Sequence, residues 1–185
     1  AKHKVIGDVR GKGLMLGGIA GVQPTEIVVL GAGTVGEFAA RSALGLGAGV
    51  KVFDNSITKL RRIQSQLGRP LFTSTIQPKT LQKALMRCDI AIGAIRGNSR
   101  APILVTEEMV EKMKTGAVIV DVSIDRGGCF ETSEVTTHKN PTIEKYGVIH
   151  YCVPNIPSRY SRTASVSISN IFILTFGYEF TYYIL

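Results

Sequence analysis

A glycine-rich hexapeptide between an apolar run and a helical pattern constrains this chain more than any other feature. The hexapeptide Gly31-Ala32-Gly33-Thr34-Val35-Gly36 directly follows the apolar run from Ile27 to Leu30. Residues 34–46 then have the spacing of a helix, one face of which would carry Val35, Phe38, Ala39, Ser42 and Ala43. A strand that turns through glycines into a helix is typical of the first half of a βαβ unit.

The same alternation of strand and helix continues along the chain. Further helices are predicted over 56–67, from Pro78, from Thr106 and from Thr163. The other apolar runs predict strands at 50–53, 71–74, 90–93, 117–122 and 148–153. Strands that are apolar on both faces and separated by helices pair in parallel, between two layers of helices. The sequence therefore predicts an α/β fold, a doubly wound parallel sheet of the Rossmann type with helices on both faces.

The alternation does not extend over the whole chain. Residues 1–24 are rich in glycine and lie outside it, so we interpret them as a lead-in or linker from another domain. Residues 25–170 form the predicted Rossmann domain. Residues 171–185, rich in Phe and Tyr, would form a helix that leads back toward the other domain and exposes apolar surface. Because the chain also begins without Met, we interpret it as a piece of a longer protein.

Composition excludes several classes of protein. Hydrophobic residues occupy 44% of the 185 positions, which excludes a disordered chain. The three cysteines, Cys88, Cys129 and Cys152, are far apart, which excludes a disulfide scaffold and favours a reducing, cytoplasmic compartment. No apolar stretch approaches the ~20 residues of a membrane span, and no cluster has the spacing of metal ligands. We expect neither a membrane nor a metal as a partner.

The positive charge is unevenly distributed. The chain has 22 basic and 14 acidic residues, a net charge of +8, and seven basic residues but no acid lie between Asn55 and Cys88. Such a cluster can bind nucleic acid, a phosphate-bearing cofactor or an acidic partner, or it can be a solvated face whose acidic counterpart lies elsewhere. No basic motif with interleaved aromatic residues accompanies the cluster, so we expect no nucleic-acid partner.

The glycine loop has the arrangement of a dinucleotide site. Gly31 allows a tight turn, Gly33 lets the backbone approach a pyrophosphate, and Gly36 lets the helix lie close to the sheet. The N–H groups at the helix start would then face the phosphates. Asp54 follows Gly36 by 18 residues, at the end of the second strand, where an acid can accept hydrogen bonds from the adenosine ribose hydroxyls. The alternative is a glycine turn that binds no ligand.

Asp54 also bears on which dinucleotide binds. A 2′-phosphate about 4 Å from its carboxylate would be repelled by ~4 kcal/mol per unit of charge at an effective dielectric constant of ~20. The sequence therefore predicts NAD as the cofactor rather than NADP. Lys59, Arg61 and Arg62 lie just beyond Asp54 and can neutralise a 2′-phosphate, which leaves tolerance of NADP open.

Two longer segments carry a family resemblance. The segment from Val120 to Ser133, with its Ile-Asp-Arg-Gly-Gly-Cys-Phe-Glu stretch, and the segment from His150 to Pro157 resemble the NAD-binding domain of the alanine dehydrogenase family. Relatives of that domain occur in proton-translocating nicotinamide nucleotide transhydrogenase and in saccharopine dehydrogenase. The resemblance covers Gly11 to about Asn170, and the quoted stretch favours alanine dehydrogenase over the transhydrogenase.

The resemblance implies a two-domain oxidoreductase that converts L-alanine, NAD and water into pyruvate, ammonium and NADH. Hydride transfer would occur in a cleft between the domains. The groups that bind the small-molecule amino-acid or 2-oxo-acid substrate would belong to the other domain, so that this chain alone would be inactive. A homo-oligomer, commonly a hexamer, is also implied. Two alternatives stay open: the soluble NAD(H)-binding domain of a transhydrogenase, and a regulatory module that senses NAD.

The resemblance also assigns roles to residues. Asp125 would face the nicotinamide and take part in catalysis, and its alternative role is to cap the Gly127-Gly128 turn. Lys59 would lie near the adenosine and Asn155 near the nicotinamide. The predicted cofactor-binding residues are Gly31, Ala32, Gly33, Thr34, Val35, Gly36, Asp54, Asn55, Lys59, Gly93, Ala94, Ile95, Ile124, Asp125, Asn155 and Ile156.

Other candidate residues are interpreted as structural. No acidic residue is spaced from His138 or His150 as the partner of a catalytic histidine would be. Cys129 is interpreted as a thiol packed in the core. Ser56 is expected to be the N-cap of the basic helix. The loop from Ile95 to Arg100 replaces an apolar, proline-containing loop that is usual in the family, so nicotinamide-side contacts there stay open.

Overall fold

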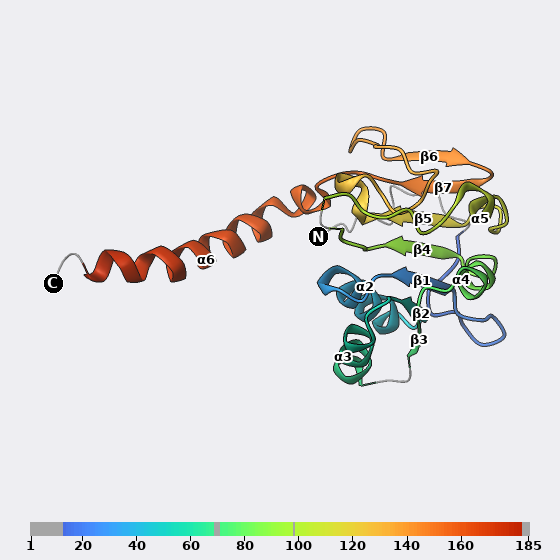
Figure 1. Cartoon of the computed structure of the whole chain (residues 1–185), viewed down its shortest axis with the longest axis horizontal. Helices are drawn as coiled ribbons and strands as arrows, with labels where there is room; N and C mark the ends of the chain where they lie inside the picture. The colour runs from blue at the N-terminus through green and yellow to red at the C-terminus, as the bar shows by residue number, and fades with distance from the viewer. Residues whose placement is uncertain (1–12, 69–70, 98, 183–185) are drawn as a thin grey trace. The chain divides into compact units, whose positions relative to one another are not determined.

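The computed structural model describes residues 13–68, 71–97 and 99–182 (Figure 1). Residues 1–12 of the predicted linker, Asn98 of the predicted loop and residues 183–185 of the tail lie outside this range. The chain divides into two compact units, the first up to Pro154 and the second from Asn155 onward.

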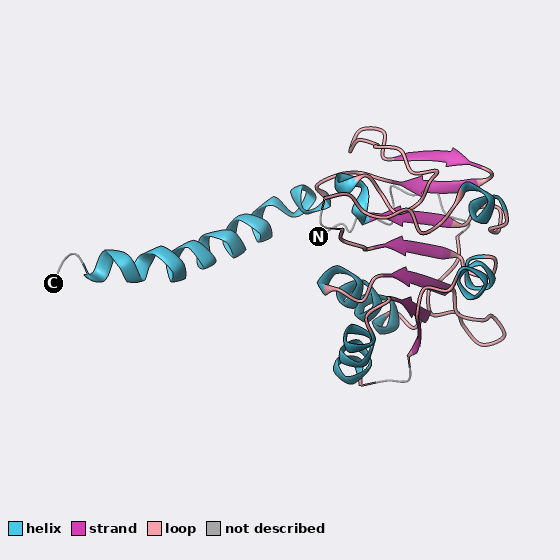
Figure 2. Cartoon of the chain, viewed as in Figure 1, coloured by secondary structure: helices cyan, strands magenta, loops and turns pink. Residues whose placement is uncertain are grey.

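Within the described residues of the first unit, seven strands form one sheet (Figure 2). The strands are β1 Glu26–Leu30, β2 Gly49–Phe53, β3 Phe72–Ser74, β4 Ile90–Gly93, β5 Val118–Asp121, β6 Thr142–Lys145 and β7 Val148–Tyr151. In the sheet order β3-β2-β1-β4-β5-β7-β6, every neighbouring pair is parallel except β7 and β6. The predicted Rossmann-type sheet is therefore confirmed, with one antiparallel strand added at its edge.

The edge strand β6 has no counterpart among the predicted strands. Its sequence, Thr-Ile-Glu-Lys, holds a single aliphatic residue and gives no apolar run. The strand forms because a tight hairpin turn pairs it with β7. The two turn residues, Tyr146 and Gly147, have φ angles of 56° and 69°, as two-residue hairpin turns of type I′ require.

Helices cover both faces of the sheet (Figure 2). The described helices of the first unit are α2 Thr34–Gly45, α3 Ile57–Leu67, α4 Pro78–Leu85 and α5 Glu107–Glu111. One apolar core lies between the sheet and α2 and α3, and a second lies between the sheet and α4 and α5. Strand β1 contributes to both, with Ile27 and Val29 in the first core and Val28 and Leu30 in the second. The doubly wound arrangement is thus confirmed at the level of packing.

Local sequence signals position the helix starts as predicted. The side chain of Ser56 accepts a hydrogen bond from the N–H of Lys59 and caps α3. Thr106 does the same for α5, through the N–H of Met109. Both side chains satisfy a donor that has no partner within the helix. The buried residues of α4 are the three predicted ones, Leu81, Ala84 and Leu85.

The buried face of α2 differs in part from the predicted face, of which Ala43 is buried as predicted. Gly36 and Ala40 are buried, whereas Val35 and Phe38 are 49% and 60% exposed. The cause is the close approach of α2 to the strand before it, since a Cβ at Gly36 would lie 1.8 Å from the carbonyl oxygen of Gly31. Only the smallest side chains fit this contact, so the larger apolar residues of the helix face outward.

Residues 13–24, the described part of the predicted linker, belong to the first unit and contact residues just before β1 and just after α2. The backbone N–H and the hydroxyl of Thr25 both donate to the carbonyl oxygen of Leu16. Gly17 lies against the end of α2, where a Cβ would be 2.7 Å from the carbonyl oxygen of Leu46. The large apolar side chains that stay exposed in this segment are Leu14, Met15, Ile19 and Val22.

The second unit consists of a short 3-10 helix, η2 Ile156–Tyr160, followed by α6 Ser161–Tyr182. Asn155 precedes η2 with a left-handed φ of 54°. The predicted C-terminal helix is confirmed and begins two residues before Thr163. In the part of the chain that the structure describes, no helix is long and apolar enough to cross a membrane.

Candidate functional site

Most of the predicted site residues lie at the carboxyl ends of the strands around β1. Strand β1 lies between β2 and β4 in the sheet, so the strand order reverses at this point. Helix α2 follows β1 on one face of the sheet, and α5 follows β4 on the other. Ligands of open α/β sheets bind in the crevice that such a reversal creates.

Two of the three loop glycines are required by the fold itself. Gly31 has a φ of 108°, a conformation that side chains disfavour, and a Cβ there would lie 2.5 Å from the carbonyl oxygen of Ala94. Gly36 is required by the contact between α2 and β1 described above. Neither glycine by itself indicates a ligand.

Gly33 is different, because nothing in the protein requires it. It has a φ of −76°, which any residue can adopt, and a Cβ added there would meet no atom within 4 Å. Gly33 is the N-cap of α2 and offers no side chain to the N–H groups of the first turn. The space in front of this helix start is therefore open, and the N–H groups that face it lack partners within the helix.

Asp54 connects the end of β2 to the glycine loop. The residue is only 7% exposed, with Oδ2 accepting the N–H of Ala32 at 2.8 Å and Oδ1 accepting the N–H of Ser56 at 2.8 Å. Each carboxylate oxygen has two lone pairs. One acceptor position therefore remains on each oxygen, enough for two ribose hydroxyls.

A pocket of about 380 Å³ adjoins the start of α2. Its wall comes from the first turn of α2, from the segment after β4 and from the 3-10 helix η1 Val122–Arg126, which follows β5. The lining residues are Val35, Ala94, Ile95, Arg96, Val122, Ser123, Asp125 and Arg126. Ser123 joins two of the segments, since its Oγ accepts the N–H of Ile95 at 3.0 Å. The structure therefore brings together four predicted residues here: Val35, Ala94, Ile95 and Asp125.

Asp125 is exposed in the wall of this pocket. Among the described residues, no hydrogen bond or ion pair joins its carboxylate to another group. The N–H groups of Gly127 and Gly128, which the sequence allowed Asp125 to cap, donate instead to the carbonyl oxygens of Ile124 and Ser123. The carboxylate of Asp125 is thus accessible to a molecule in the pocket.

Asp121 is absent from the predicted site residues, yet it organises the loop that carries Asp125. The fully buried carboxylate accepts the N–H groups of Ser123 and Cys129, each at 3.0 Å, and the hydroxyl of Ser133 at 2.8 Å. Burial raises the pKa of this carboxyl, and the hydrogen bonds oppose the rise. A signal existed in the sequence: an acid that ends an apolar strand just before a glycine turn can accept the N–H groups that the turn leaves unpaired.

The other predicted residues lie away from the pocket wall. Gly93 is buried, and a Cβ there would lie 2.5 Å from Sγ of Cys129; Ile124 is 5% exposed. The side chain of Asn55 accepts the N–H of Ile76 at 3.0 Å. Lys59 is exposed on α3. Asn155 and Ile156 belong to the second unit. The cofactor contacts predicted for all the residues named in this paragraph stay predictions.

His150 and Cys129 have structural roles. Nδ1 of His150 lies 3.0 Å from the carbonyl oxygen of Val148, which can only accept, so Nε2 accepts the hydroxyl of Thr132 at 2.8 Å. Burial lowers the pKa of His150. Burial and the carboxylate of Asp121 raise the pKa of the Cys129 thiol far above its usual range, which keeps it protonated.

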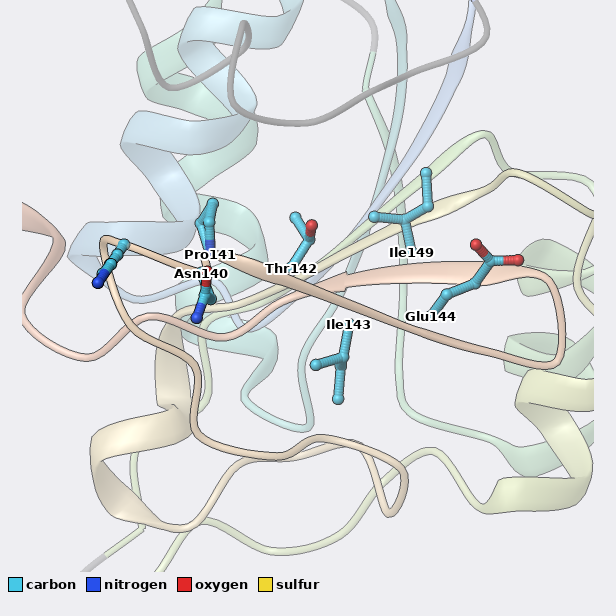
Figure 3. A pocket seen from close by; sticks show the side chains of 7 residues that line it. Asn140, Pro141, Thr142, Ile143, Glu144 and Ile149 are labelled. Carbon is cyan, nitrogen blue, oxygen red and sulfur yellow. The ribbon is translucent and has the colours of Figure 1, made fainter.

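A second pocket, of about 530 Å³, lies beside the edge strand β6 (Figure 3). Ile143 points to the opposite side of this strand from Thr142 and Glu144, as alternate strand residues do (Figure 3). None of the predicted site residues lines this pocket. Across the described ranges, no group of three or more His, Cys, Asp or Glu side chains could hold a metal ion.

Comparison with known proteins identifies relatives over most of the chain. The family model "Alanine dehydrogenase/PNT, C-terminal domain" matches residues 3–178. The alanine dehydrogenase of Mycolicibacterium smegmatis is 45% identical over 161 residues, which are 86% of this chain and 43% of that protein. The chain therefore spans less than half the length of this relative.

Solved structures give the same result. A structure of L-alanine dehydrogenase matches with a TM-score of 0.86 and 42% sequence identity, over 89% of this chain and 46% of that one. A transhydrogenase from Sinorhizobium meliloti matches with a TM-score of 0.67 and 29% identity, over 82% of this chain and 44% of that one. Since the family match extends from residue 3 to residue 178, the chain belongs to the alanine dehydrogenase/PNT family and corresponds to its C-terminal, NAD-binding domain.

Proposed function

We propose that this chain binds NAD(H) at the glycine loop. The observation that carries the proposal is the open space at Gly33, which no contact within the protein explains. A pyrophosphate fits this space because N–H donors and the positive end of the α2 dipole face it. Asp54 would accept the hydroxyls of the adenosine ribose, and the nicotinamide would enter the pocket beside Val35 and Asp125.

Calorimetric titration of the 185-residue chain tests this proposal. We expect uptake of NAD and NADH, with a gain of about 2.7 kcal/mol in the free energy of unfolding when ligand is present at about 100 times its Kd. NADP should bind at least ~10-fold more weakly, because its 2′-phosphate would meet the carboxylate of Asp54. A folded chain that takes up neither NAD nor NADH contradicts the proposal. Equal affinity for NADP contradicts the role of Asp54.

We further propose that the longer protein containing this domain oxidises L-alanine to pyruvate and ammonium. The match to alanine dehydrogenases at 42–45% identity supports this activity. NAD, when bound, supplies the acceptor for the hydride that leaves the α-carbon. Val35, Ala94 and Ile95 form the apolar part of the pocket wall. Asp125 would either accept the proton released by the amino group or, while still ionised, stabilise the positive charge that develops on nitrogen.

Replacement of Asp125 in the intact enzyme tests its catalytic role. Asp125→Asn should lower kcat for L-alanine about 10²–10⁴-fold, the usual size of a general acid–base contribution. NAD affinity should change little, because Asp125 holds no part of the glycine loop. Glu134→Gln is a matched control, since Glu134 is an exposed acid paired only with Lys145 in the described structure and lies outside the pocket. An Asp125→Asn enzyme with the wild-type kcat would contradict the catalytic assignment.

A transhydrogenase domain is the second candidate function, supported by the structural match at 29% identity. Such a domain would exchange hydride between two nucleotides. Steady-state assays of the intact protein separate the two functions: formation of NADH from L-alanine and NAD supports the dehydrogenase, and nucleotide-to-nucleotide exchange without deamination supports the transhydrogenase.

For the intact dehydrogenase, we propose the homo-oligomer that its family implies. Light scattering of the intact protein tests this proposal.

A further inference from the structure

Ala32, between two loop glycines, is held from both sides. Its N–H donates to Oδ2 of Asp54 at 2.8 Å, and its carbonyl oxygen accepts Nη2 of Arg62 at 2.9 Å. Ala32 is fully buried, and both contacts come from outside the loop, one from the end of β2 and one from α3. Because glycines flank Ala32, the backbone on either side has wide rotational freedom. Together with the N–H of Gly31, which donates to the carbonyl oxygen of Phe53 at 2.7 Å, these two hydrogen bonds orient the loop.

The contact to Arg62 acts directly on the ligand-facing donor. The carbonyl of Ala32 and the N–H of Gly33 belong to one planar trans peptide, so they point in opposite directions. When Arg62 holds the carbonyl oxygen on the α3 side, the N–H of Gly33 must point to the other side. That N–H belongs to the residue whose missing side chain leaves the helix start open.

The charge of Arg62 is also compensated within the protein. Its Nη2 lies 3.8 Å from Oε2 of Glu37, whose Oε1 pairs with Arg41 at 3.0 Å. The side chain of Glu37 is only 13% exposed, although it belongs to the first turn of α2. Arg62 thus connects α3, the glycine loop and the start of α2. A 2′-phosphate would have to compete with Glu37 and the carbonyl oxygen of Ala32 for the guanidinium of Arg62.

We infer that Arg62 is a positioning residue of the dinucleotide site, which orients the peptide between Ala32 and Gly33, and that it is not the receptor of a 2′-phosphate. The inference rests on the proposed NAD(H) binding. It resolves one of the alternatives that the sequence left open, because Arg62 was one of three basic residues able to neutralise that phosphate. The neighbouring Arg61 is exposed and makes no hydrogen bond among the described residues, so it serves as a matched control.

Calorimetric titration of the 185-residue chain with ADP-ribose and with its 2′-phosphorylated form tests the inference. We expect Arg62→Gln to weaken both ligands by the same factor, about 5- to 10-fold, the usual range for loss of one charged hydrogen bond that is partly exposed to solvent. Arg62→Lys should recover most of the affinity, because the contact uses a single donor. Arg61→Gln should change affinity less than about 2-fold, as expected of an exposed residue. Loss confined to the 2′-phosphorylated ligand, or no loss for either, overturns the inference.

Hydrogen exchange of the ligand-free chain supplies a readout that does not depend on binding. Arg62→Gln should speed amide exchange in residues 31–35 while amides of β5 keep the wild-type rate, and Arg61→Gln should leave both regions unchanged. If the wild-type chain takes up no dinucleotide, the proposed function fails, and exchange still decides whether Arg62 orients the loop. Unchanged exchange in Arg62→Gln overturns the positioning role.

Discussion

The loop glycines differ in what they contribute, and substitution by alanine separates them. Gly33→Ala should leave the free energy of unfolding within about 1 kcal/mol of wild type, because the new methyl meets no atom and the backbone is unstrained. It should lower NAD affinity at least ~10-fold, since the methyl occupies the space of the pyrophosphate. Gly36→Ala should instead destabilise or prevent folding, because its Cβ would lie 1.8 Å from a carbonyl oxygen.

Urea denaturation and calorimetry of both variants measure these effects. Gly36→Ala is the matched comparison, since it adds the same methyl to the same motif three residues later. A Gly33→Ala chain that is stable and binds NAD as tightly as wild type would show that the open space at Gly33 is not a ligand site.

Individual residues were predictable where a motif specifies a backbone conformation. The glycine pattern predicted the tight turn at Gly31 and the close helix contact at Gly36, because a strand–helix turn of this kind has few solutions. The ligand contacts of the loop and of Asp54 stay predictions. Asp121 was missed although it ends an apolar strand just before a glycine turn, because the identity of the N–H groups that it accepts depends on the path of the folded loop. The orientation of Arg62 was likewise not predictable, since exposed helix positions give no indication of which way a long side chain turns.

At the scale of elements, the loop after β5 depends on one carboxylate. Asp121→Asn should lower the free energy of unfolding by about 2–4 kcal/mol, because an amide nitrogen would face buried N–H donors. Ser133→Ala should cost less, about 1 kcal/mol, since the N–H groups of Ser123 and Cys129 keep their acceptor. Urea denaturation of the two variants checks the order. An Asp121→Asn chain as stable as wild type would mean that the loop has other support.

Most helices and strands were predictable because the spacing of apolar residues along the sequence indicates which positions are buried. Strands β1, β2, β4, β5 and β7 are rich in apolar residues, and the helix caps at Ser56 and Thr106 have local causes. Two features depended on packing instead. The strand β6 exists through its pairing with β7, and α2 buries its glycine and alanine face because the backbone of β1 lies so close.

At the scale of the whole molecule, His150 makes stability depend on pH. Burial lowers the pKa of His150 in the folded chain below its usual 6.5, so the unfolded chain binds the proton more tightly. The free energy of unfolding should therefore fall as pH decreases through about 6.5, by at most about 1.4 kcal/mol per pH unit, and level off below the folded pKa. Chemical denaturation at pH 7.5, 6.5 and 5.5 measures this slope. His150→Gln should reduce it, and an identical slope in wild type and variant would contradict the assignment.

The placement of β1 has a consequence for the whole first unit. This strand supplies two side chains to each of the two cores, and it runs directly into the glycine loop. An occupant of the loop therefore restrains a segment that packs against both helical layers. Saturation with dinucleotide should slow the opening of both helical layers together, including α4 and α5, which lie on the opposite face from the helix that begins at the loop.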